Sequence, residues 1–181
     1  MNRLDFTITF HSPFRVARGE GGRGAHDTID DTDRLPATSL AGVMRATATT
    51  LLGEQNPVLD EVFGSDAIPC PWRWSPARPL HGWQDSTPAA RVRIDAETGS
   101  AQQDMLVFAE QTGAEQAEFH IRRFRHVAPE RRDLHLAVLT IAAQATRSLG
   151  AWRRRGLGWV GIRCTHEPDE ALVRTFLELR T

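Results

Sequence analysis

Apolar and polar residues alternate along the first segment of the chain. Between residues 3 and 10 every second side chain is apolar: Leu4, Phe6, Ile8 and Phe10. A period of two predicts a β-strand with one buried face. Shorter strand-like runs are predicted at 92–94, 105–110, 117–124 and 158–163.

Apolar residues recur at helical spacing in four other segments. They predict helices that start after Pro36 and end at Gly53, and helices over 57–63, 133–149 and 168–180. Thr38 or Ser39 is the expected cap of the first helix. Gly42 inside this helix indicates close packing or the close approach of another backbone. Residues 67–84 are rich in Pro and Trp, which favours an extended edge segment over a central strand.

The order of these elements predicts an α+β, ferredoxin-like (RRM-like) fold. We expect one domain over residues 1–181. A β-hairpin is expected as an insertion at about 91–110, because a turn signature at 95–99 separates two strand-like runs. A glycine- and arginine-rich loop at 150–161 precedes the last strand.

Composition and charge limit the cellular locations and the surface properties that this protein can have. No run of apolar residues approaches the length of a membrane span. The two cysteines, Cys70 and Cys164, are far apart, which favours a reducing, cytoplasmic location without a disulfide framework. The net charge is −1, yet residues 121–163 hold ten arginines against two acids, and residues 27–66 hold eight acids against two arginines. A basic face is therefore compatible with a neutral total.

The glycine- and arginine-rich loop has the composition of a nucleic-acid contact. It combines glycines for close backbone approach, arginines for phosphate and aromatic rings for stacking. These residues are Gly150, Gly156 and Gly158; Arg153, Arg154 and Arg155; and Trp152 and Trp159. A solvated surface turn is the alternative interpretation.

Residues 15–34 predict a long loop, with four glycines followed by a run of acids. Arg15, Arg18 and Arg23 could follow a nucleic-acid backbone, and His26 and Asp27 could reach a ligand. A flexible, solvated loop is the alternative.

Four segments, taken in order, resemble the RAMP superfamily of CRISPR-associated proteins. Residues 35–45, Leu-Pro-Ala-Thr-Ser-Leu-Ala-Gly-Val-Met-Arg, resemble its Pro-Gly-Ser-Ser-Leu-Lys-Gly-x-x-Arg helix start. Residues 62–64 resemble its Leu-Phe-Gly, residues 93–99 its thumb region, and residues 150–158 its C-terminal glycine-rich loop. Ala37-Thr38 departs from the Gly-Ser of the pattern, and Ala41 replaces its Lys, a guide-phosphate contact.

Within this superfamily, the chain is most similar to the repeating backbone subunit of type III effector complexes. The resemblance implies binding of guide CRISPR RNA along its phosphates and presentation of the guide to a complementary target RNA, with DNA as the alternative target. It also implies contacts with other copies of the chain and with other effector subunits, and no membrane partner. The implied RNA-binding residues are Arg15, Arg18, Arg23, Arg45, Gly150, Arg153, Arg154, Arg155 and Gly156.

The resemblance further implies a candidate for target cleavage. Gly24-Ala-His-Asp27 matches the family's Gly-x-x-Asp, so Asp27 would act on the target strand and hold Mg²⁺ or Mn²⁺, with His26 assisting proton transfer. Asp30, Asp31 and Asp33 are alternatives to Asp27.

Two other functions stay open at this point. One is a non-catalytic capping or structural subunit of a CRISPR complex. The other is a metal-independent endoribonuclease that processes guide precursors with His26 as base, although such enzymes are usually longer.

Overall fold

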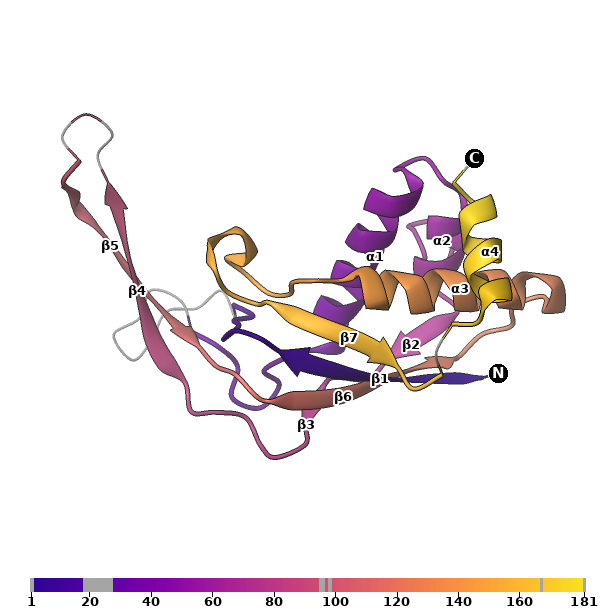
Figure 1. Ribbon diagram of the computed structural model, residues 1–181, viewed down its shortest axis with the longest axis horizontal. Coiled ribbons are helices and arrows are strands. Elements are labelled where there is room, and N and C mark those ends of the chain that lie inside the picture. The colour runs from indigo at the N-terminus through magenta and orange to yellow at the C-terminus, as the bar shows by residue number, and fades with distance from the viewer. Residues whose placement is uncertain (1, 18–27, 95–96, 98, 167, 181) are drawn as a thin grey trace.

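The computed structural model describes residues 2–17, 28–94, 97, 99–166 and 168–180, which form two antiparallel sheets and four α-helices (Figure 1). The strands are β1 (Arg3–Phe10), β2 (Trp72–Trp74), β3 (Arg78–Pro79), β4 (Thr87–Ile94), β5 (Ala101–Gln111), β6 (Gln116–Arg123) and β7 (Val160–Cys164). The helices are α1 (Ala37–Leu52), α2 (Val58–Phe63), α3 (Pro129–Ala145), α4 (Glu170–Glu178) and the short 3₁₀ helix η1 (Arg153–Arg155). The mixed α+β class predicted from the sequence is confirmed.

The main sheet has the order β2-β6-β1-β7, and β3 also pairs with β6. Each neighbouring pair is antiparallel. The alternation of β1 places Phe6 opposite Phe119 of β6, and their rings stack with centroids 4.9 Å apart. The apolar face of this strand is therefore buried in the hydrophobic core, as its pattern predicted.

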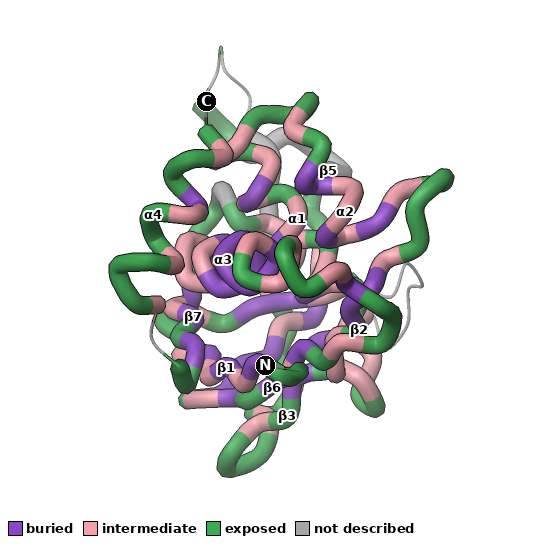
Figure 2. The backbone as a smooth tube through the Cα atoms, turned by 90° about the vertical axis from the view of Figure 1, so that its right-hand side faces the viewer, coloured by how far each residue is buried: buried purple, intermediate pink, exposed green. Residues whose placement is uncertain are grey.

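The helices cover one face of this sheet (Figure 1). α1 buries Leu40, Met44 and Ala48, which lie four residues apart on one stripe. α3 is the most enclosed helix, with buried residues on most of its circumference (Figure 2). The other face of the sheet is left without a helix.

α3 is shifted by four residues at each end from the predicted range of 133–149. It begins at Pro129, a residue suited to the first helical turn, and ends at Ala145 because Thr146 has an extended backbone. Leu149 still reaches the core, with 1% of its surface exposed, although it lies in the following loop. The predicted helix was too long at its C-terminus because the buried loop residue Leu149 has the same spacing as the apolar residues of the helix.

The Pro- and Trp-rich segment forms the edge of the sheet, as its composition indicated. β2 is the terminal strand, and β3 forms only a short pairing of Arg78 and Pro79 with β6. Trp72 is buried in the core, whereas Arg73 faces solvent.

β4 and β5 pair only with each other and extend away from the main sheet (Figure 1). At the base of this hairpin Ala109 and Glu110 are buried, whereas Leu106 and Val107 farther out are exposed. The hairpin therefore has a packed base and carries at least two exposed apolar side chains farther out.

Cys70 and Cys164 are free thiols. Burial raises the pKa of both thiols, so neither is a ready thiolate at neutral pH. Within the described residues, no helix is long and apolar enough to cross a membrane.

Candidate nucleic-acid interface

The glycine- and arginine-rich loop is a closed turn between α3 and β7. Its arms are joined by hydrogen bonds from Leu149 N to Gly158 O (2.9 Å) and from Val160 N to Arg147 O (3.0 Å). At its tip, η1 holds the three arginines in one short helical turn. The sequence folds this way because Trp152 and Gly156, on either side of η1, both have left-handed backbones.

Two glycines of this loop are required by its packing against other backbone. Ala151 N donates to Arg15 O at 2.8 Å, which brings the loop onto the segment after β1. A Cβ atom at Gly150 would lie 2.2 Å from Arg15 O, and one at Gly158 would lie 2.0 Å from Leu149 O. Neither position has room for a side chain. Contacts within the chain therefore explain why glycine occupies positions 150 and 158, and no bound ligand is needed to explain it.

The tip of the loop has the properties expected of a phosphate contact. Arg153 and Arg155 are exposed. Gly156 has no neighbouring atom within 4 Å of a Cβ placed on it, so its surroundings are open. The side chain of Arg154 lies outside the described part of the structure.

Arg15 differs from this expectation. Its side chain is 2% exposed, and its guanidinium carbon lies 4.5 Å from the centre of the Trp152 ring. This cation–π contact supports the loop from within, and the burial argues against a phosphate contact by Arg15. Arg18 and Arg23 lie outside the described residues.

An open pocket of about 320 Å³ lies between α1, the segment after β1 and the glycine- and arginine-rich loop. Its lining includes Ser39, Gly42, Ala46, Gly150, Ala151 and Arg153. We call it the α1–loop pocket. The two segments that meet here, 35–45 and 150–158, are separated by more than one hundred residues in the sequence.

Gly42 faces open space in this pocket. In the described part of the chain, no atom outside its own stretch of helix lies within 4 Å of a Cβ placed on it. Within the described residues, the expected close packing or close approach of another backbone is therefore wrong. Because Gly42 has no side chain, the backbone of α1 is accessible from the pocket at this position.

The N-terminus of α1 borders the α1–loop pocket. Pro36 is the N-cap residue, and no side chain caps the helix, so the predicted cap by Thr38 or Ser39 is wrong. The first turn contains no acidic residue. The partial positive charge of the helix dipole is therefore not offset by a nearby carboxylate of this turn.

Arg45 points toward α2. Its guanidinium donates to Asp60 Oδ1 at 2.9 Å and also to the carbonyl oxygen of Gly64. Arg45 therefore links α1 to the C-terminal end of α2 through these hydrogen bonds. Its predicted contact with guide phosphate stays a prediction.

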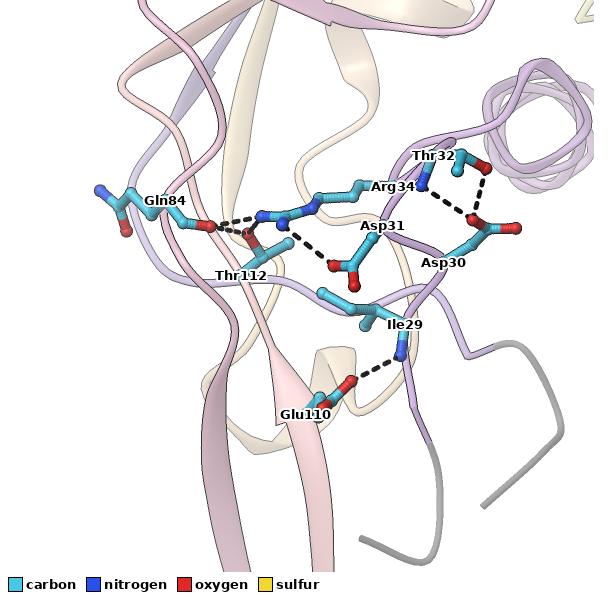
Figure 3. Close-up of polar contacts among 8 residues, drawn as sticks. All are labelled: Ile29, Asp30, Asp31, Thr32, Arg34, Gln84, Glu110 and Thr112. Atoms are coloured by element: carbon cyan, nitrogen blue, oxygen red, sulfur yellow. Dashed lines mark hydrogen bonds and ion pairs between the residues drawn. The ribbon is translucent and has the colours of Figure 1, made fainter. Parts of the chain in front are cut away.

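The acidic loop at residues 29–34 is held by local contacts (Figure 3). Asp30 Oδ1 accepts hydrogen bonds from Thr32 N (2.9 Å) and Thr32 Oγ1 (2.6 Å). Asp31 forms an ion pair with Arg34 at 3.0 Å. Burial, followed by the nearby charge of Asp30, raises the pKa of Asp33. Structural contacts thus account for Asp30 and Asp31.

The same loop is anchored to the root of the β4–β5 hairpin (Figure 3). Glu110 Oε2 accepts a hydrogen bond from Ile29 N at 3.2 Å, and both residues are buried. Arg34 donates to Thr112 Oγ1 at 2.9 Å and to the carbonyl oxygen of Gln84. Sequence reasoning missed Glu110, and the available signal was an acid at the end of a strand-like run.

His26 and Asp27 lie outside the described residues, and their predicted role stays a prediction. In the part of the chain that is described, no group of three or more His, Cys, Asp or Glu side chains could hold a metal ion. The described residues therefore do not by themselves fit a Mg²⁺ or Mn²⁺ site.

Comparisons with known proteins agree with the motif resemblance. A sequence model of the RAMP superfamily matches residues 7–161, which is most of the chain. No curated protein matches the sequence.

Among the solved structures that share the fold are two chains of type III-B Cmr-beta complexes. One is a chain of the type III-B Cmr-beta complex bound to cognate target RNA, with a TM-score of 0.62 and 19% identity. That match covers 90% of this chain and 58% of the other, so this chain spans little more than half of its length. The other is a chain of Cmr-beta in the apo state, with a TM-score of 0.64, 10% identity and coverage of 92% and 98%.

Proposed function

This chain belongs to the RAMP superfamily, and from this premise we propose that it is an RNA-binding subunit of a type III CRISPR effector complex. In this proposal, the α1–loop pocket binds the phosphate backbone of a guide RNA. One observation carries it: the two family-like segments 35–45 and 150–158, distant in sequence, line a single open pocket.

The chemistry of the pocket supports a phosphate ligand. Arg153 lines it, and the exposed Arg155 lies on the same helical turn. The uncapped N-terminus of α1 offers N–H groups to an anion. Gly42 leaves room for an RNA backbone to approach the helix.

We further propose that the fold is ferredoxin-like and that the β4–β5 hairpin is its thumb. The order β2-β6-β1-β7 with helices on one face supports the first statement. The separate, projecting hairpin with exposed Leu106 and Val107 supports the second, because such an arm could insert between paired strands of nucleic acid.

The proposed partners are guide RNA, a complementary target RNA, other copies of this chain and other effector subunits. A structural neighbour bound to cognate target RNA supports this setting. Several adjacent copies in a purified complex would indicate a backbone subunit, whereas one copy at an end would indicate a capping subunit.

Cleavage of the target through Asp27, with Mg²⁺ or Mn²⁺, is proposed only as an additional activity. An Asp27→Ala variant should keep guide binding and lose cutting of a guide-matched RNA. Persistent cutting would assign the activity to another residue or subunit.

The pocket is tested by replacing its exposed arginines. Each phosphate contact to single-stranded RNA contributes about 0.7 to the slope of log affinity against log salt. Arg153→Ala combined with Arg155→Ala should weaken binding of a fluorescein-labelled single-stranded RNA and flatten this slope by about 1.4. Fluorescence anisotropy across a salt series measures both.

Arg174→Ala is the matched control, because Arg174 is an exposed arginine on α4 that does not line the pocket and forms only a 3.4 Å ion pair with the exposed Glu170. It should behave as wild type. An unchanged affinity and slope in the double variant would contradict the proposed pocket. RNA with repeat-derived ends, extracted from the purified complex, would identify the guide.

A further inference from the structure

The face of the main sheet that no helix covers is strongly basic. Alternation along the strands exposes five arginines and two acids on this face: Arg3, Arg73, Arg78, Arg122 and Arg163, with Asp5 and Glu118. The apolar residues between them, such as Leu4 and Ile121, face the core. The open face therefore offers charge and little aliphatic surface.

Three of these arginines form a row across adjacent strands. Arg3 of β1 is paired in register with Arg122 of β6, and Arg122 is paired with Arg73 of β2. We call Arg3, Arg122 and Arg73 the arginine row. Like charges directly opposite one another destabilise a sheet, so the row has a cost for folding.

The fold compensates this charge only in part. Arg3 forms an ion pair with Asp5 at 2.6 Å, but both side chains are about half exposed. Among the described residues, no acid forms an ion pair with Arg122. A ligand with negative charge would relieve the repulsion along the row.

An exposed aromatic ring lies beside the row. The guanidinium carbon of Arg73 is 3.3 Å from the centre of the Phe124 ring, and 47% of Phe124 is exposed. Stacked arginine and aromatic groups are the platforms on which unpaired bases stack. The pair thus adds base recognition to the charge of the row.

The neighbouring part of the face is a cleft of about 450 Å³ that includes Arg3, Arg78 and His120 in its lining. Burial, together with the charges of Arg3, Arg122 and Arg78, lowers the pKa of His120, and Asp5 opposes this effect. The arginines thus act on this cleft in the direction opposite to Asp5.

We propose that the arginine row and Phe124 bind a segment of single-stranded RNA on the open face of the sheet, separately from the α1–loop pocket. The row is about 10 Å long, given strand spacings of about 4.8 Å, and its charges can contact phosphates while Phe124 and Arg73 stack with a base. A protein partner is less favoured because the face lacks the apolar centre of a stable interface. This site does not depend on the pocket, since it lies on the opposite side of the sheet from the helices.

The test uses the full chain and a fluorescein-labelled 20-nucleotide oligouridylate. Phe124→Ala should weaken binding about tenfold, the effect of losing one stacked base. Arg122→Ala should reduce the salt slope by about 0.7. It should leave the melting temperature equal or higher, because it removes a like-charge pair, so lost binding will not reflect unfolding.

Both variants are repeated with Arg153→Ala and Arg155→Ala, and Arg174→Ala serves as control. If Phe124→Ala and Arg122→Ala weaken RNA binding by the same factor with and without the pocket substitutions, the open face is a separate site. This conclusion holds even if the pocket substitutions alone have no effect. Wild-type affinity and slope in both variants, or losses only with an intact pocket, would overturn it. Photo-cross-links from position 124 to another subunit instead of RNA in the assembled complex would also overturn it.

Discussion

At the scale of single residues, Gly42 connects helix stability with the proposed function. A glycine within a helix lowers its stability by about 1 kcal/mol relative to alanine. In many helices close packing explains such a residue, but among the described residues beyond its own stretch of helix, no atom lies within 4 Å of the position that its Cβ would occupy. Under the proposed function, this open position would let an RNA backbone approach α1 at the α1–loop pocket.

Gly42→Gln should therefore separate folding from binding. Helix propensity should raise the melting temperature by a few degrees, because the new Cβ has open space among the described residues. The same side chain should fill part of the pocket and weaken RNA binding, measured by anisotropy. Thr50→Gln, at an exposed position of α1 outside the pocket lining, should leave affinity unchanged. Wild-type affinity of Gly42→Gln would exclude the pocket as the RNA site.

At the scale of elements, the glycine- and arginine-rich loop contains glycines with two different tasks. Gly150 and Gly156 both have positive φ, at 77° and 87°. Only Gly150 is in close contact with another segment, because its missing side chain admits Arg15 O. Gly156 serves the turn alone.

Alanine substitutions should distinguish these tasks by urea denaturation. Gly156→Ala should lose about 1–2 kcal/mol from left-handed strain. Gly150→Ala should lose a further 1–3 kcal/mol, because the loop and the segment after β1 must separate. Equal losses would show that the contact between these segments contributes little to stability.

At the scale of the whole molecule, one buried histidine joins three elements. Trp72 Nε1 of β2 donates to His135 Nδ1 of α3 at 3.1 Å, and His135 Nε2 lies 3.7 Å from Glu61 Oε2 of α2. Arg131 pairs with the same carboxylate at 2.7 Å. Burial lowers the pKa of His135, and the neighbouring Glu61 only partly opposes it. The neutral imidazole is thus the form that the folded protein favours.

This arrangement predicts loss of stability in acid. Since the folded pKa of His135 lies below its unfolded value of 6.5, the unfolded chain binds more protons, and stability falls as the pH drops below 6.5. The slope from this group is at most about 1.4 kcal/mol per pH unit. Urea unfolding between pH 5 and 7.5 should show a weaker dependence in His135→Asn. A profile parallel to that of wild type would assign the effect to other groups, of which His120 is one.

Much of the element order was predictable because strands and amphipathic helices carry local periodicities. The alternation of β1, the stripe of α1 and the Pro-rich edge strand β2 are all found where the sequence predicted them. The ends of α3 were not predicted correctly. Leu149 lies in a loop but is buried like a helix residue, and a local pattern does not distinguish a buried loop residue from a buried helix residue. The site was predicted less completely, because the burial of Arg15 and the anchor at Glu110 depend on contacts between distant segments.

The sequence by itself determined the order of the elements, the family and the glycine- and arginine-rich loop, because these depend on neighbouring residues and on motifs. Only the tertiary structure decided which charged groups share a surface. Strand register places Arg3, Arg122 and Arg73 side by side, and the chain fold brings the start of α1 to the loop at 150–158. Register and packing are set by the closure of a common core, so residues about 120 positions apart acquire a relation that no local pattern contains.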